Sequence, residues 1–154
     1  MRGVLCLEDG FFLEGDLLNY TRETCGEVVL FTGMSGYEEA LTDPAYRGQI
    51  MVFTFPMIGA YGLPPGSGQS SGITVRGVVA RDIWDGPVDG AATPLRRGLE
   101  TGECPAIHAV NTRELAIHLR DHGCQKGVIA AVPEGGLGPL ELSRLMASAA
   151  KFDM

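Results

Sequence analysis

The alternation of apolar and polar residues predicts a strand-rich first half of the chain. Apolar runs at residues 4–7 and 11–14 flank the dipeptide Asp9-Gly10, which is typical of tight hairpin turns because glycine readily takes positive φ. The chain is therefore expected to open with a β-hairpin. Further runs of strand character occupy residues 28–31, 50–55, 73–80, 106–110 and 128–132.

Helix starts are predicted from capping residues. Ser35 and Glu38 have the spacing of a capping box, and Pro44 should end that helix after about two turns, because the residue before a proline disfavours helical geometry. Thr93 is expected to cap a second helix that ends near Leu99. Later helices are predicted over residues 112–122 and 139–150.

The third predicted helix carries the clearest signals. Asn111 can cap it, Glu114 occupies the reciprocal capping position, and Gly123 supplies a stop. Leu115 and Leu119 lie four residues apart and should face the core. Strands early in the chain, followed by alternating helices and strands, indicate an α/β fold in which helices pack against a mixed sheet.

Composition fits one folded domain spanning residues 1–154, with 45% apolar and 20% charged residues. The net charge of −7 repels phosphate backbones and anionic lipids, which argues against nucleic-acid and membrane-surface binding. Glu8 and Asp9 interrupt the first apolar run too early for a signal peptide, and no apolar run approaches the roughly 18 residues of a spanning helix. We therefore expect a cytoplasmic protein.

The cysteines show neither catalytic nor metal-binding spacing. No C-x-x-C pair is present, and no cysteine has the small neighbours of a strand-to-helix elbow, where an amidotransferase-type nucleophile is expected. No G-x-S-x-G motif occurs either, and His108 is expected to be a structural residue at a strand end. The four cysteines are Cys6, Cys25, Cys104 and Cys124.

Other candidate sites favour structural interpretations. His118 and His122 share a helix face at metal-chelating spacing, but no third ligand is evident, so a solvated face is expected. The acidic pairs Glu8-Asp9 and Glu38-Glu39 are expected to be structural rather than catalytic. Residues 62–72 predict a surface loop without a phosphate-binding pattern. No catalytic residue and no metal site is therefore predicted.

One long stretch carries a far more specific pattern. Residues 26–50 read GEVVLFTGMSGYEEALTDPAYRGQI, which closely resembles the N-terminal region of carbamoyl-phosphate synthase small chains. Shorter matches to the same family occur at residues 7–10, 55–62, 75–81 and 105–115. The resemblance covers about residues 5–131.

The resemblance implies a three-layer β/β/α domain of the swivelling type with a mixed sheet. In that family the small chain continues into a glutaminase domain, C-terminal to this one, whose Cys, His and Glu release ammonia from glutamine. The synthetase large chain then uses ATP and bicarbonate to convert the ammonia into carbamoyl phosphate for arginine and pyrimidine synthesis. Because no glutaminase domain is present here, we expect the chain to be part of a longer protein.

The resemblance further implies that this domain is a non-catalytic part of a ligase and holds no cofactor of its own, since ATP is used by the large chain. Its role is then to dock and to help complete the glutamine site. The expected partners are the large chain, the glutaminase domain and glutamine. The alternative is a stand-alone binding or regulatory protein that has kept the fold without the enzyme.

The chain departs from the family pattern at several positions. Family members commonly have Ser where this chain has Ala45, and that Ser touches the glutamine bound in the neighbouring domain. Ala45 is therefore the one candidate glutamine-binding residue, and it has no hydroxyl to offer. Phe31 and Ala60 replace Asn, Ala109 replaces Gly, and Asn111 replaces Asp.

Overall fold

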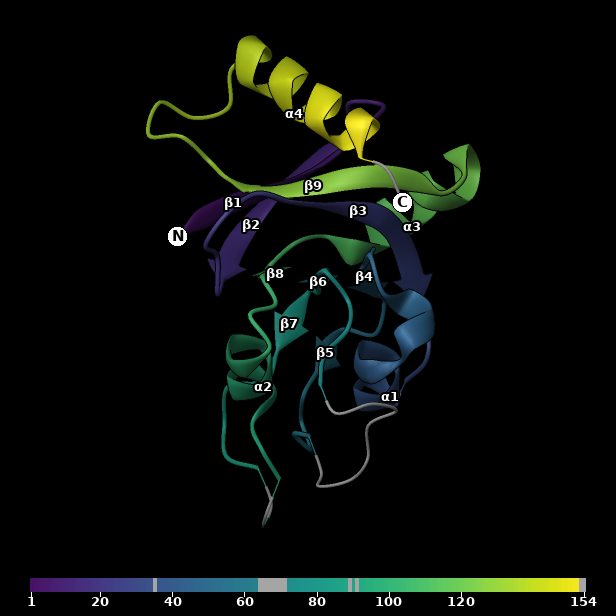
Figure 1. The fold of residues 1–154 in the computed structure, drawn as a ribbon, viewed down its shortest axis with the longest axis vertical. Helices are drawn as coiled ribbons and strands as arrows, with labels where there is room; N and C mark the ends of the chain where they lie inside the picture. Colours follow the sequence, from purple (N-terminus) through teal and green to yellow (C-terminus); the bar gives the residue numbers. More distant parts are fainter. Residues whose placement is uncertain (35, 64–71, 89, 91, 153–154) are drawn as a thin grey trace.

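Seven strands of the chain close into a barrel, and helices pack against it (Figure 1). The structure is a computed structural model that describes residues 1–34, 36–63, 72–88, 90 and 92–152. In chain order the elements are β1 (Arg2–Leu7), β2 (Phe12–Leu18), β3 (Thr24–Phe31), α1 (Tyr37–Thr42), the 3-10 helix η1 (Pro44–Tyr46), β4 (Gln49–Phe53), β5 (Met57–Ile58), β6 (Gly77–Val79), β7 (Asp82–Ile83), α2 (Leu95–Thr101), β8 (Ala106–His108), α3 (Thr112–His122), β9 (Gln125–Ala131) and α4 (Pro139–Lys151).

The barrel mixes parallel and antiparallel pairs in the order β1-β2-β8-β6-β4-β3-β9. Strands β3, β4, β6 and β8 run parallel to one another, whereas β1 pairs antiparallel with β2 and β9. Antiparallel pairs of β2 with β8 and of β3 with β9 complete the ring. The predicted mixed sheet is confirmed, and the swivelling type stays a prediction.

Successive residues of a strand face opposite sides of the barrel wall, which gives the molecule more than one core. Leu5 and Leu7 of β1 belong to the cluster that also holds Ile50 of β4, and α3 adds Leu115 and Leu119 to it. All five are at most 5% exposed, so these side chains are buried.

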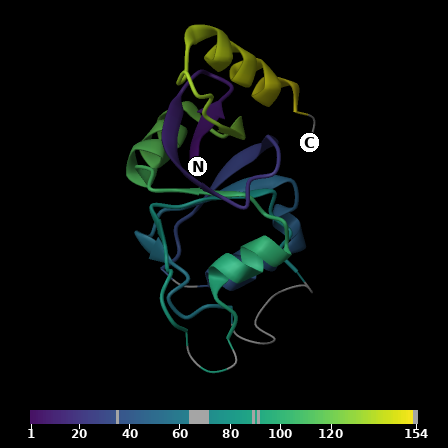
Figure 2. The ribbon, with the colours of Figure 1, turned by 90° about the vertical axis from the view of Figure 1, so that its left-hand side faces the viewer.

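Helix α4 covers the outer side of β1 and β9. Val4 and Cys6, which alternate with the inward leucines of β1, pack with Leu145 and Ala149 of the helix. Figure 2 shows α4 at one end of the molecule and α2 toward the other. There α1 and α2 form a third cluster with β4 and β6. In the described part of the chain, no helix is long and apolar enough to cross a membrane.

The opening hairpin is confirmed. Strand β1 pairs with β2 so that Leu5 lies opposite Leu13. In the turn, the Asp9 carboxylate accepts a hydrogen bond from the Phe11 backbone N–H at 3.0 Å, and Gly10 has φ of 97°. The Asp side chain and the glycine conformation are the features from which the turn is predicted.

Helix α1 ends at Thr42, as Pro44 predicts, but its start differs from the expected capping box. The N-cap is Gly36, which is left-handed at φ 85° and forms no side-chain cap. The expected capping residue Ser35 lies outside the described residues. Much of the predicted loop at 62–72 also lies outside them, because residues 64–71 are not described.

The prediction that Thr93 caps α2 is wrong. Thr93 forms an isolated antiparallel bridge with Leu63, in which each backbone N–H donates to the other's carbonyl. This pairing holds Thr93 outside the helix, so Pro94 becomes the N-cap, without a side-chain cap bond.

Helix α3 matches its prediction over residues 112–122. The Asn111 side chain accepts a hydrogen bond from the Glu114 backbone N–H at 3.0 Å, and Gly123 ends the helix at φ 84°. Strand β8 stops earlier than the predicted 106–110, because Ala109 takes φ of 61° and turns the chain toward the helix. The predicted strand at 73–80 is likewise reduced to three residues.

Candidate functional site

The candidate glutamine-binding residue, Ala45, lies on the exposed turn η1 that follows α1. The Asp43 carboxylate caps this turn by accepting a hydrogen bond from the Ala45 backbone N–H at 2.9 Å. The Thr74 hydroxyl donates to the carbonyl oxygens of Leu41 at 3.2 Å and Asp43 at 2.8 Å. Side-chain bonds from within and outside the turn therefore fix the place of Ala45, whose methyl group faces solvent.

The other end of α1 is held by a pair of tyrosines. The rings of Tyr37 and Tyr61 stack at 4.5 Å between centroids. The Tyr61 hydroxyl donates to the Glu38 carboxylate at 2.5 Å and accepts from the Gly36 backbone N–H at 3.0 Å. Burial and the Glu38 carboxylate raise the pKa of Tyr61 to about 12. The phenol therefore stays a hydrogen-bond donor at neutral pH, and Glu38 has a structural contact, in agreement with its expected role.

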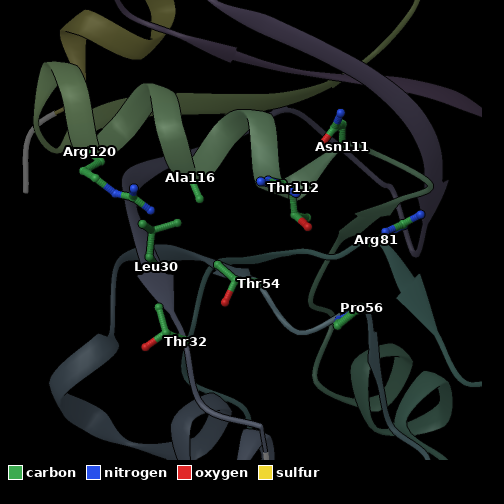
Figure 3. Close-up of a pocket in the computed structure, with 10 residues that line it drawn as sticks. Leu30, Thr32, Thr54, Pro56, Arg81, Asn111, Thr112, Ala116 and Arg120 are labelled. Carbon is green, nitrogen blue, oxygen red and sulfur yellow. The ribbon is translucent and has the colours of Figure 1, made fainter.

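A second feature is a cavity of about 340 Å³ under α3 (Figure 3). It lies where the chain leaves the carboxyl ends of the parallel strands β3, β4 and β6, an edge at which α/β sheets commonly bind ligands. The lining residues are Leu30, Thr32, Thr54, Pro56, Arg81, Asn111, Thr112, Arg113, Ala116 and Arg120. Ala45 does not line this cavity, so the structure does not bring the predicted site residue and these side chains together.

Three of the cysteine thiols resist ionisation. Burial, helped by Asp9, raises the pKa of Cys6 to about 11, and burial raises that of Cys104 to about 12. Burial also raises the pKa of Cys25, with a smaller contribution from a nearby glutamate. Cys124 is exposed, but it follows a helix and precedes a strand, which is the reverse of a nucleophile elbow. These surroundings keep the three thiols with raised pKa, those of Cys6, Cys25 and Cys104, protonated at neutral pH.

His118 departs from the solvated face expected for it. Its Nε2 lies 2.7 Å from the Asp9 carboxylate of the opening turn, and its side chain is only 16% exposed. The ring stacks between Phe11 and His122, with centroids 4.1 and 4.3 Å away. Among the described residues, no group of three or more His, Cys, Asp or Glu side chains could hold a metal ion. His118 therefore joins α3 to the hairpin, and His122 stacks on it from within the same helix.

His108 occupies the last position of β8, at the strand end where it is expected. Burial lowers its pKa, and the positive charge of Arg96 adds to the shift, whereas three aspartates oppose it. Its partly buried position at a strand end supports a structural role.

The structure thus defines a barrel domain with a rigid surface turn and a basic cavity, and the comparisons with known proteins identify its family. The family model for the carbamoyl-phosphate synthase small chain, CPSase domain, matches residues 5–129, so the chain belongs to that family.

Curated relatives named carbamoyl phosphate synthase small chain agree with this assignment. The chain is 45% identical to the one from Methanopyrus kandleri over 84% of its own length and 36% of that relative. It is 41% identical to the one from Caldanaerobacter subterraneus subsp. tengcongensis over 89% of this chain and 39% of the relative. It is 39% identical to the one from Symbiobacterium thermophilum over 95% of this chain and 41% of the relative. The chain spans about two fifths of the length of these relatives.

Proposed function

We propose that this chain is the N-terminal, non-catalytic module of the subunit that supplies ammonia from glutamine to carbamoyl-phosphate synthase. The observation that carries the proposal is the family match over residues 5–129, together with relatives that extend well beyond it. In the assembled enzyme, a C-terminal glutaminase domain releases the ammonia, and the large chain consumes it with ATP and bicarbonate. The product serves arginine and pyrimidine synthesis.

Exposed apolar side chains on the segments before and after α1 support docking of the glutaminase domain. Met34, which follows β3, is 77% exposed, and Phe55 and Met57 lie partly exposed on the segment that follows β4. Tyr61 is also exposed, and its hydroxyl bonds to the start of α1. Large apolar side chains that stay exposed are typical of protein interfaces. We assign these side chains to the interface with the glutaminase domain of the same longer chain.

The turn η1 presents position 45 to the bound glutamine. Its caps from Asp43 and Thr74 hold the backbone in place, so the turn forms a rigid wall rather than a mobile loop. With alanine at this position, the wall lacks the hydroxyl that family members commonly offer to glutamine. The module therefore completes the glutamine site less well than its Ser-bearing relatives do.

The reading frame that encodes the chain tests this proposal directly. We expect the codons after Met154 to continue into a glutaminase domain whose cysteine lies on a strand-to-helix elbow between small residues. A natural stop codon immediately after Met154 contradicts the proposal and favours a stand-alone binding or regulatory protein.

A further inference from the structure

We propose that the cavity under α3 is a binding site for a small soluble oxyanion, a phosphate or carboxylate group held by Arg81, Arg113, Arg120 and Thr112. Its size of about 340 Å³ lies at the lower end of the range for small-molecule sites. This inference rests on the cavity alone and does not depend on the proposed function.

The charge around the cavity is the first reason. Arg81, Arg113 and Arg120 line it, and all three are exposed. In the part of the chain that the structure describes, none of the three forms an ion pair, although the chain has a net charge of −7. Among the residues that the structure describes, no carboxylate lines the cavity itself; Asp82 lines the recess next to it, together with Arg81 and Arg113. A local excess of positive charge in an acidic chain favours an anionic ligand.

A threonine hydroxyl at the cavity wall is the second and independent reason. Thr112 is only 3% exposed and lines the cavity, and no other described residue forms a hydrogen bond with its hydroxyl. Figure 3 shows the Thr112 side chain extending from α3 into the space between the helix and Thr54. A hydroxyl of a buried residue that meets the cavity and has no partner in the described part of the protein is placed to bond a ligand there.

The start of α3 adds further donors. The Asn111 side chain accepts a hydrogen bond from the Glu114 backbone N–H. It therefore does not cap the backbone N–H groups that precede Glu114 in the first turn of the helix. These groups and the helix dipole attract negative charge. The Ala109 N–H donates to the carbonyl oxygen of Arg81 at 3.0 Å, which fixes the backbone of Arg81 beside the helix start.

The donor set determines the class of ligand. A guanidinium presents parallel N–H groups that match the two oxygens of a carboxylate or a phosphate. Figure 3 shows Arg120 and Arg81 at opposite ends of the cavity, with Thr112 and Thr54 between them. A ligand that spans them must accept hydrogen bonds along its length, which a phosphate or carboxylate on a small molecule does.

Isothermal titration calorimetry on the 154-residue chain tests the site, with inorganic phosphate in one series and succinate in another. Sodium chloride keeps the ionic strength constant in both. We expect saturable binding of at least one of the two anions. Phosphate alone identifies a phosphate ligand, and succinate alone identifies a carboxylate ligand. Failure of both to bind overturns the proposal.

Variants distinguish a specific site from nonspecific attraction of the anion to arginine side chains. Arg113→Gln should weaken the binding by roughly tenfold to a hundredfold, because it removes a charge-assisted hydrogen bond. Thr112→Val keeps the shape and removes only the hydroxyl, so it should weaken binding by about threefold to tenfold. The control is Arg97→Gln, an exposed arginine on α2 that does not line the cavity.

The pattern across the variants decides the outcome. Binding that is weakened by Arg113→Gln and unchanged by Arg97→Gln supports the site. Equal weakening by both shows nonspecific attraction and overturns the proposal. If Thr112→Val abolishes the cooperative melt, Arg113→Gln still decides, because Arg113 is exposed and forms no ion pair in the described part of the chain.

Discussion

Ala45 occupies an exposed turn whose backbone is fixed independently of its side chain. The bond from the Ala45 N–H to Asp43 and the bonds from Thr74 involve no atom of the Ala45 methyl group. A serine at this position therefore adds a hydroxyl at the surface without changing the turn. Because the side chain does not hold the turn, a substitution at position 45 tests the effect of one hydroxyl on glutamine use without altering the backbone.

We predict that Ala45→Ser in the full-length complex raises kcat/KM for glutamine by about threefold to tenfold, the effect of one neutral hydrogen bond. The value for free ammonia should not change, because ammonia needs no glutamine pocket. Steady-state kinetics with each nitrogen donor measures both. Ala147→Ser, at an exposed position of α4, is the matched control. If the ratio of the two values stays the same, position 45 does not belong to the site.

Asp9 connects the opening turn to two distant elements. Its carboxylate accepts hydrogen bonds from the Phe11 N–H at 3.0 Å and the Gln125 side chain at 2.7 Å, and lies 2.7 Å from His118. Burial alone raises the pKa of Asp9, but these hydrogen bonds and the charge of His118 outweigh it and lower the pKa below its usual value.

A carboxylate whose pKa is lower in the folded than in the unfolded chain stabilises the fold. This stabilisation is fully present above the pKa of the unfolded chain, about 3.9, and is lost as the pH falls through the pKa of the folded chain. We therefore predict that the melting temperature of the native chain exceeds that of Asp9→Asn at pH 7, and that the difference shrinks below about pH 4. Thermal melts across this range measure it. A difference that is independent of pH would show that the charge of Asp9 does not contribute.

Among the elements, α1 ends just before Pro44, and η1 begins at this proline. Pro44 occupies the first turn of η1, where its fixed φ suits the helical geometry. Pro44 is exposed, so the core does not depend on its side chain. This segment can therefore lose rigidity without losing the fold.

We predict that Pro44→Gly lowers the free energy of unfolding by only about 1 kcal/mol, chiefly by giving the unfolded chain more freedom. Glutamine-dependent synthesis by the full-length complex should fall more than this small change in stability explains, because the turn no longer presents position 45 rigidly. Thermal melts and activity with glutamine and with ammonia measure the two effects. Complete loss of the cooperative melt would show that the segment is core rather than interface.

Elements with local signals could be predicted from the sequence, and those that depend on distant pairing could not. The hairpin and α3 are set by neighbours in sequence, namely Asp9 with Gly10 and Asn111 with Gly123. Thr93 also has the residue type of a cap, but its backbone pairs with Leu63, thirty residues earlier. Such pairing overrides local propensity because both backbone groups of Thr93 are already bonded.

At the scale of the whole molecule, closure of the barrel is the feature that periodicity does not reveal. Apolar strands predict a buried sheet, but the pairing of β9 with both β1 and β3, which closes the ring, joins strands far apart in the sequence. The basic cavity likewise cannot be predicted from sequence patterns, since Arg81 and Arg113, which line it, are 32 positions apart. Both residues lie in stretches that resemble the family.

We propose that this domain positions glutamine without itself releasing ammonia. At neutral pH, thiols with pKa values near 11 and 12, as at Cys6 and Cys104, are almost wholly protonated and are poor nucleophiles. The most direct measurement is ammonia release from glutamine by the purified 154-residue chain, with single Cys→Ser variants at each of its four cysteines. We expect no release above the buffer blank for the native chain or any variant. Turnover by the native chain that disappears with one of these substitutions would contradict this proposal.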